Sequence, residues 1–201
     1  SVEMIDSIIK LAAADLANLP FLEKVGGIVT PLKKKTKAGR VITTPVDYAP
    51  LPSGKLNVFV PDNKIVGMAY FELEGESNQR TTSGKGQIRA EVILAAWVNV
   101  QRVLPADIGV IKRAIIHAMP STIYPEADAG FSAANVAYIG GASINATFGR
   151  YGYDNDESKM FRYPFCGFGL KFSVTYIPNL CFVDVQVVEN NDCFNPDKDC
   201  L

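Results

Sequence analysis

The stretch QIRAEVILAAWVNVQ, residues 87–101, decides the fold class of this chain. Every even-numbered position in it is apolar, and polar residues alternate with them near both ends: the apolar set is Ile88, Ala90, Val92, Leu94, Ala96, Val98 and Val100. Alternation with a period of two is typical of a long antiparallel strand with one face on a hydrophobic core. The other face is apolar at Ile93, Ala95 and Trp97. We expect this patch to be covered by residues 20–61 or to form an interface with a partner.

The segment before this strand predicts its hairpin partner. Residues 65–75 place Phe71 on one face and Glu72 and Glu74 on the other, as expected of a strand whose glutamates face solvent. Residues 76–86 are polar and glycine-bearing, which predicts a long flexible loop between the two strands.

The same alternation predicts three strands further along the chain, over residues 136–148, 168–176 and 180–188. Gly140 and Gly141 indicate a bulge or turn inside the first of them. Two amphipathic helices complete the pattern, over residues 1–19 and 105–119. The predicted fold class is therefore α+β, with a mainly antiparallel sheet and two helices.

The chain is predicted to be a single domain, 1–201, with two segments outside its core. Residues 20–61 are rich in proline and glycine and predict a long extended N-terminal arm that packs on an adjacent subunit. Residues 62–188 form the α+β core, and residues 189–201 predict a loose, acidic C-terminal tail.

A basic cluster lies within the predicted arm, at Lys33, Lys34, Lys35, Lys37 and Arg40. It is either an electrostatic contact, with nucleic acid or an acidic neighbour, or the solvated tip of a hairpin. Further contact residues are expected in the loops 76–86 and 149–159: Arg80, Lys85, Tyr151, Tyr153 and Asp154. The acidic residues of the second loop lack the spacing of a calcium-binding loop.

Composition argues against an enzyme. The chain holds one histidine, His117, and no nucleotide-binding loop, metalloprotease motif or nucleophile elbow. We therefore predict no catalytic residues, no metal and no cofactor. The net charge of −1 disfavours a general nucleic-acid or membrane binder. The four cysteines, without a CxxC pair, are expected to be reduced thiols: Cys166, Cys181, Cys193 and Cys200. Neither a signal peptide nor a membrane-spanning run is recognisable.

The order of elements resembles the neck and tail-terminator proteins of tailed bacteriophages. The resemblance rests on the strand pair at 65–101, the helix at 105–119, and the stretch YPFCGF at 163–168 that opens the strand through Tyr176. It covers about residues 60–190. It implies a curved sheet flanked by two helices, and a non-catalytic virion protein that forms a homo-oligomeric ring at the head–tail junction. The implied partners are further copies of the chain, neighbouring portal, neck or tail proteins, and DNA in the channel, without a membrane. Assembly would take place in the host cytoplasm.

Two other functions stay open at this stage. A β-rich module that binds a ligand or glycan would use convergent aromatic residues, for which the chain offers Tyr151, Tyr153, Phe161 and Tyr163. A carboxylate-based hydrolase would use a pair of acidic residues, and its activity would respond to substitution of Glu91 or Asp154.

Overall fold

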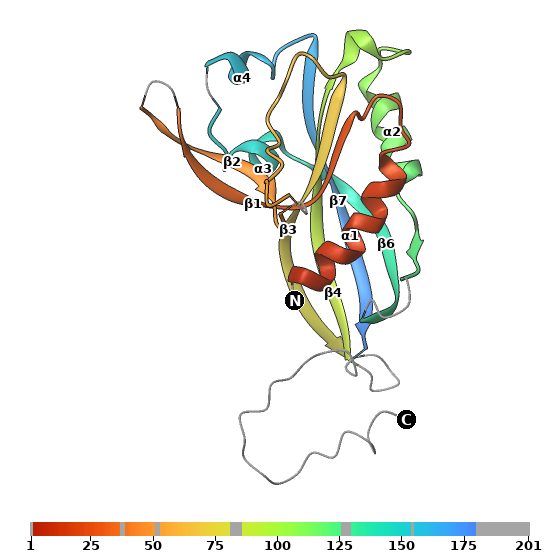
Figure 1. Cartoon of the computed structure of the whole chain (residues 1–201). Helices are drawn as coiled ribbons and strands as arrows, with labels where there is room; N and C mark the ends of the chain where they lie inside the picture. Colours follow the sequence, from red (N-terminus) through yellow and green to blue (C-terminus); the bar gives the residue numbers. More distant parts are fainter. Residues whose placement is uncertain are drawn as a thin grey trace, which may run out of the picture.

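A curled seven-stranded sheet organises the chain, with helices on both of its faces (Figure 1). The computed structural model describes residues 2–36, 39–50, 53–80, 86–125, 130–153 and 155–179. Within these ranges the strand order is β2-β1-β3-β4-β7-β6-β5. Every neighbouring pair is antiparallel except β1 and β3, which run parallel. The predicted α+β class and the mainly antiparallel sheet are confirmed.

The elements follow one another as α1 (Val2–Leu16), β1 (Lys24–Lys35), β2 (Val41–Asp47), β3 (Gly67–Arg80), β4 (Gly86–Asn99), the 3-10 turn η1 (Val100–Arg102), α2 (Ile108–Ala118), β5 (Thr122–Ile123), β6 (Phe131–Ala142), α3 (Ile144–Phe148), α4 (Asn155–Lys159) and β7 (Phe165–Pro178). The two predicted helices are α1 and α2. Two short helices that the sequence pattern did not predict, α3 and α4, lie on the opposite face of the sheet (Figure 1).

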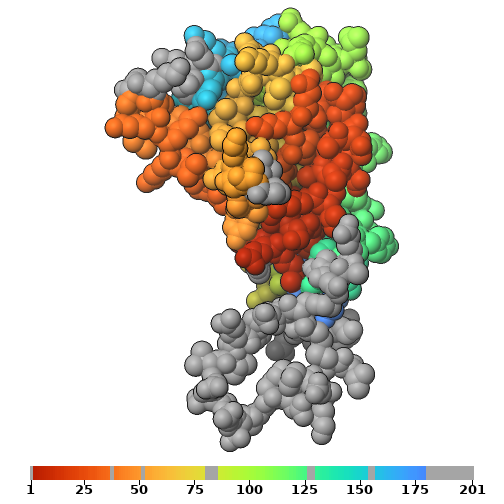
Figure 2. All heavy atoms as spheres, viewed as in Figure 1, coloured from red at the N-terminus to blue at the C-terminus, as the bar shows by residue number. Residues whose placement is uncertain are grey.

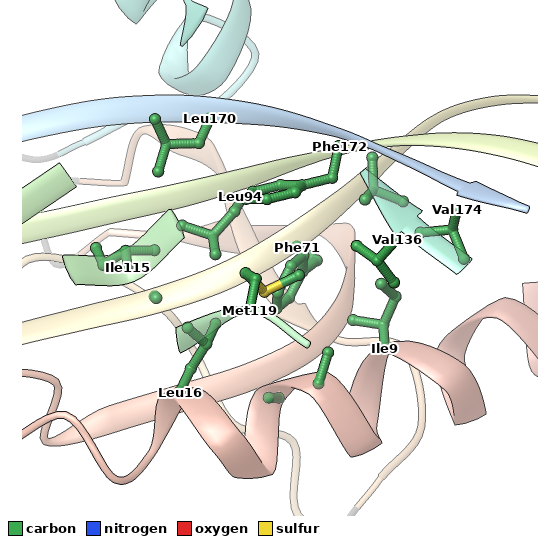
Figure 3. Packing of buried hydrophobic residues seen from close by; sticks show 14 of the residues in the cluster. Ile9, Leu16, Phe71, Leu94, Ile115, Met119, Val136, Leu170, Phe172 and Val174 are labelled. Carbon is green, nitrogen blue, oxygen red and sulfur yellow. The ribbon is translucent and has the colours of Figure 1, made fainter. Parts of the chain in front are cut away.

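The main core lies between the sheet and the helices α1 and α2. Ile9 and Leu16 of α1 point toward the sheet and belong to the same buried cluster as Phe71 of β3 and Leu94 of β4 (Figure 3). The apolar even-numbered residues of β4 from Ala90 to Val98 are all buried in this cluster, as the alternation predicted. A helix with one apolar stripe is stable only when that stripe is covered, and the sheet supplies the cover.

A buried carboxylate fixes α1 to the sheet. Asp6 is 4% exposed, and its Oδ1 accepts a hydrogen bond of 3.0 Å from the backbone N–H of Ile28. Its Oδ2 lies 2.7 Å from Nζ of Lys10, one helical turn further along. The Ile28 N–H is free to bond the helix because the β1–β3 register shifts between Val25 and Ile28.

The predicted extended arm, residues 20–61, is corrected by the structure. The first two thirds of it enter the sheet, because β1 pairs with β3, and β2 pairs with β1. Val29 and Phe59 are buried, so much of the segment packs on its own chain. The apolar groups of this proline-rich segment are short, so the sequence allowed short strands but favoured an extended arm. The far half of the β1–β2 hairpin does project from the body of the molecule (Figures 1 and 2).

The predicted loop at 76–86 is also largely wrong. β3 continues to Arg80 and β4 begins at Gly86, with Ser77 opposite Arg89 and Gln79 opposite Gln87. The segment is polar because the described residues at that end of β3 are exposed, which gives strand residues the composition of a loop. Residues 81–85 lie outside the described part of the chain.

The strand predicted over 136–148 begins earlier, at Phe131, and stops at Ala142. Residues 144–148 form α3 instead, because the Ser143 Oγ accepts a hydrogen bond of 3.1 Å from Ala146 N–H and caps the helix. The predicted bulge is confirmed: Gly140 has a φ of 146°, and the register with β7 shifts between Tyr138 and Gly140. The predicted strand at 180–188 and the tail at 189–201 lie outside the described residues.

Candidate functional site

One edge of strand β6 is unpaired over residues 137–142 in the described part of the chain. One side of β6 pairs with β7, and on the other side the described strands pair with it only near its start, where β5 meets Ala134 and Asn135. Val136 N–H then donates to the Ser121 carbonyl at 2.9 Å. Beyond that point, no strand of the described ranges covers residues 137–142 on this side.

This edge is both apolar and uncharged. Tyr138 and Ile139 are each 44% exposed, and Ile144, just past the end of the strand, is 61% exposed. The sequence from 130 to 149 contains no charged residue. Protein monomers usually protect a free strand edge with lysine, proline or a covering segment. The uncharged run is visible in the sequence, but its exposure is not, because the same run would suit a buried strand.

The opposite end of the sheet carries the basic cluster. Lys33, Lys35 and Arg40 are exposed on the projecting β1–β2 hairpin, whereas Lys34 is half-buried with its Nζ 3.9 Å from Oε1 of Glu157. Lys37 lies outside the described residues. The hairpin also exposes two large apolar side chains, Leu32 and Val41. The cluster therefore lies on a hairpin that projects from the body of the molecule (Figure 1).

The predicted patch on β4 is not an exposed interface, because Ile93, Ala95 and Trp97 are 0% exposed. The other alternative, cover by residues 20–61, holds in part: Val29 and Phe59 pack in the same buried cluster, together with residues further along the chain. Trp97 Nε1 donates a hydrogen bond of 2.5 Å to the Met160 carbonyl, and its indole stacks on Phe165 with 5.2 Å between ring centroids. We call the covering residues, 148–153 and 155–161, the outer segment.

The predicted loop contacts are dispersed. Tyr151 is 7% exposed and packs in the second hydrophobic cluster beneath the outer segment, and Tyr153 packs against that cluster half-buried. Neither is a free surface contact, because the segment that carries them folds onto the sheet. Arg80 ends β3 opposite Gly86, and its side chain is outside the description. Lys85 and Asp154 lie outside the described residues.

A buried polar cluster, which the sequence did not predict, lies under the outer segment. Glu72 of β3 is 0% exposed rather than solvated, and its Oε2 lies 3.1 Å from Nε of Arg150. Both of its oxygens are enclosed, as are the hydroxyl oxygens of Tyr70 and Tyr151, and none has a well-directed hydrogen bond. Enclosed polar groups without good partners are rare and costly. The burial of Glu72 could have been inferred from its strand pairing: it lies opposite Ile93, on the same face of the sheet as the apolar residues Ile93, Ala95 and Trp97 of β4.

Burial dominates the electrostatics of this cluster. It raises the pKa of Glu72 to about 7, although the Arg150 guanidinium and the nearby Tyr151 hydroxyl oppose the shift. Arg150 compensates only in part because its side chain is 46% exposed, so water weakens its interaction with the carboxylate. Burial likewise raises the pKa of Tyr70 well above its ordinary value. Such a group can be a functional carboxyl, but its oxygens are closed to a substrate in this conformation.

A shallow groove of about 250 Å³ lies between α1 and β1. Small residues form most of it, with Lys10 and Asp47 as its charged members. Burial raises the pKa of Asp47, and Asn57 Nδ2 donates a hydrogen bond of 2.7 Å to its Oδ2. The groove lacks the aromatic lining and convergent polar groups that small-ligand sites use.

Among the residues that the structure describes, those of the alternative functions do not form a site; Asp154 is outside them. Tyr153 and Phe161 pack against one another with 4.8 Å between ring centroids, whereas Tyr163 is 78% exposed apart from them. Glu91 is half-exposed beside Arg89, and His117 is exposed on α2. Cys166 is a free, half-buried thiol whose pKa is raised by burial; the other three cysteines are outside the described ranges. Among the described residues no group of three His, Cys, Asp or Glu side chains is placed to hold a metal.

Comparison with protein-family models and with curated proteins finds no match to this chain. The described helices are all too short or too polar to cross a membrane. Function is therefore inferred from the geometry of the chain itself.

Proposed function

We propose that this chain is a non-catalytic structural subunit that assembles with copies of itself into a ring at the head–tail junction of a tailed bacteriophage. The observation that carries the proposal is the exposed, uncharged edge of β6 over residues 137–142. A free strand edge offers a row of backbone N–H and C=O groups for another chain to complete. Here the exposed Tyr138 and Ile139 side chains add apolar surface that a partner would bury.

The arrangement of the sheet favours a ring over a symmetric pair. β6 lies near one end of the strand order and the β1–β2 hairpin forms the other end, so two unlike surfaces face away from each other. Contact between unlike surfaces is head-to-tail, and it repeats until the rotation between subunits closes a ring. The outer side of β2 is partly covered by its own chain, since Phe59 N–H donates to the Pro45 carbonyl and Gly152 N–H to the Thr43 carbonyl. The hairpin therefore acts through its projecting half.

The head–tail position follows from the resemblance in element order, which extends over β3, β4, α2 and β7. The neighbouring portal, neck or tail proteins would meet the subunit along the axis of the assembly. The exposed Lys33, Lys35 and Arg40 suit an acidic neighbour or the DNA that passes through such a channel. Their attraction would be strongest at low salt, because exposed charges are screened within about 10 Å at 0.1 M ionic strength.

Mass measurement in solution, with electron microscopy of the same sample, tests the proposal. The purified chain should reach a mass several times 21.8 kDa and show closed rings. Ile139→Lys should leave a folded monomer, since it places a charge on the free edge of β6. Leu104→Lys, at a residue 92% exposed away from that edge, is the matched control and should assemble like the wild type.

Two outcomes would count against the proposal in different ways. A wild-type chain that stays monomeric at every concentration, and is missing from purified phage particles, would overturn the ring itself. Rings that persist in Ile139→Lys would show that another surface makes the contact. Glycan binding by an isolated monomer would favour the ligand-binding alternative.

A further inference from the structure

Glu72 lies where the outer segment joins the sheet. Its carboxylate is closed off by Arg150 and Tyr151, which precede α4, and by Tyr70 on its own strand. The carboxylate of Glu72 is removed from water, and the one cation that compensates for this, Arg150, is itself partly exposed. Its charge state therefore alters how favourably the outer segment packs on β3.

The outer segment also braces the projecting hairpin. Gly152 N–H donates a hydrogen bond of 2.8 Å to the Thr43 carbonyl of β2, and the Gly152 backbone packs on Ile42. Lys34 of β1 reaches Glu157 of α4 at 3.9 Å. If the outer segment loosens at Tyr151, the hydrogen bond that the adjacent Gly152 makes to Thr43 is weakened, and the hairpin loses that contact.

We propose that Glu72 is a proton-sensitive latch: its neutral form holds the outer segment on the sheet, and its ionised form loosens that segment and the hairpin braced on it. The proposal concerns a single chain and does not rest on ring formation. If the proposed function also holds, the latch sets how firmly the hairpin is held before a neighbour binds it.

The groups that face Glu72 determine the direction of the switch. The titratable and charged groups that interact with Glu72 are Tyr70 and Glu74 on β3, and Arg150, Tyr151 and Tyr153 in the outer segment. Two further groups act at one remove: Glu157 interacts with Tyr153, and Lys171 Nζ bonds Glu74 at 2.9 Å. Burial and Glu74 oppose ionisation of Glu72, while Arg150 and, to a smaller extent, the Tyr151 hydroxyl favour it. The pKa in the closed form is raised from 4.5 to about 7.

The sign of the pH dependence follows from that shift. When the segment opens and water reaches the carboxyl, its pKa falls back toward 4.5, so the open form releases a proton that the closed form holds. The closed form is favoured fully below pH 4.5. Its advantage is lost progressively as the pH rises to about 7, above which Glu72 is ionised in both forms.

Trp97 reports on the latch from inside the molecule. It is the single tryptophan of the chain, it is 0% exposed, and its indole N–H bonds the carbonyl of Met160 in the outer segment. In the full-length chain, raising the pH from about 5 to about 8.5 should shift its emission to the red and increase quenching by acrylamide, with a midpoint near pH 7. Glu72→Gln, which stays neutral, should lose that transition.

Three controls separate the latch from other causes. Glu91→Gln removes a half-exposed carboxylate from the neighbouring strand and should keep the wild-type transition. His117→Asn should also keep it, because His117 is exposed on the other helix layer. Arg150→Gln removes the cation that opposes the shift, so its midpoint should move to higher pH; this half-exposed position provides a second test should Glu72→Gln fail to fold.

Hydrogen exchange at the Gly152 amide tests the link to the hairpin. The ratio of the wild-type exchange rate to that of Glu72→Gln, taken at one pH, cancels the intrinsic pH dependence of exchange. It should be near one at about pH 5 and rise clearly above one at about pH 8.5. A transition in Trp97 emission that survives in Glu72→Gln, or no transition in the wild type, would overturn the latch, whether or not the chain forms rings.

Discussion

Gly169 shows how a missing side chain positions a helix. It lies on the outer face of β7, and a Cβ at this position would run into Thr147 of α3 and stand 2.9 Å from Ala142. Gly167, on the same face, leaves room for the ring of Phe161. The alternation of glycine with larger residues at 167–170 therefore lets α3 and the outer segment approach the sheet.

Gly169→Ala should destabilise the chain by about 1–3 kcal/mol, because the new methyl group overpacks a site closed by α3. Gly75→Ala is the matched control. It also lies in a strand, and a Cβ there meets nothing within 4 Å, so it should be neutral or up to about 1 kcal/mol more stable. Urea unfolding followed by circular dichroism measures both. Equal stability of the two variants would show that α3 does not press on β7.

Single residues also mark where sequence reasoning stops. Glu72 and Glu74 look identical in the strand pattern, yet Glu72 is fully buried and Glu74 reaches Lys171 in partly exposed surroundings. The difference arises from Arg150 and Tyr151, about eighty residues away along the chain. Whether a polar side chain is buried depends on which segment folds over it, and the alternation of residues along one strand contains no information about a distant segment.

Helices and strands could be predicted from the sequence where one face of the element packs on the core, because the apolar residues then recur with the period of that element. The period of two identified β3, β4 and β7, and the stripe at three- and four-residue steps identified α1 and α2. The pattern failed at 144–148, where apolar and polar residues alternate although the backbone is helical. There the Ser143 cap and the packing of Phe148 in the second cluster outweigh the alternation, which is too short to decide on its own.

Helix α1 is expected to contribute through packing rather than through its own propensity. Ile9→Ala should lower the free energy of unfolding by about 2–5 kcal/mol, since Ile9 is 0% exposed in the main core and the substitution leaves a cavity. Leu104→Ala removes a leucine that is 92% exposed and should change it by less than about 0.5 kcal/mol. Thermal or denaturant melts of the two variants compare them directly. A small effect of Ile9→Ala would mean that α1 is loosely held.

At the scale of the whole molecule, the sheet has two unlike ends. If the contact is head-to-tail, two variants that are each blocked at a different end can still pair with each other through their intact ends, but only as a heterodimer. Val41→Asp on the hairpin and Ile139→Lys on β6 should each be monomeric alone. Mixed in equal amounts, they should form a heterodimer through the two remaining intact surfaces, and should grow no further.

Native mass spectrometry of the mixture distinguishes this from a symmetric contact. An isologous pairing of β6 with β6 would leave Val41→Asp able to dimerise alone and would give no heterodimer. A mixture that restores full-sized assemblies would show that the hairpin is dispensable.

The position of β7 in the strand order has a consequence for the timing of folding. β4 is a central strand, and Ile88 pairs with Tyr176, so its second neighbour is synthesised long after its first. Until β7 emerges from the ribosome, β6 lacks the strand that joins it to the sheet, and the apolar stripe of α1 faces an incomplete partner. Pairings between segments so distant in sequence slow folding and give intermediates whose exposed apolar surface makes them prone to aggregate. A chain that carries an uncharged strand such as β6 would then meet other nascent copies before it is finished, so we expect its yield to depend on the rate of synthesis and on chaperones.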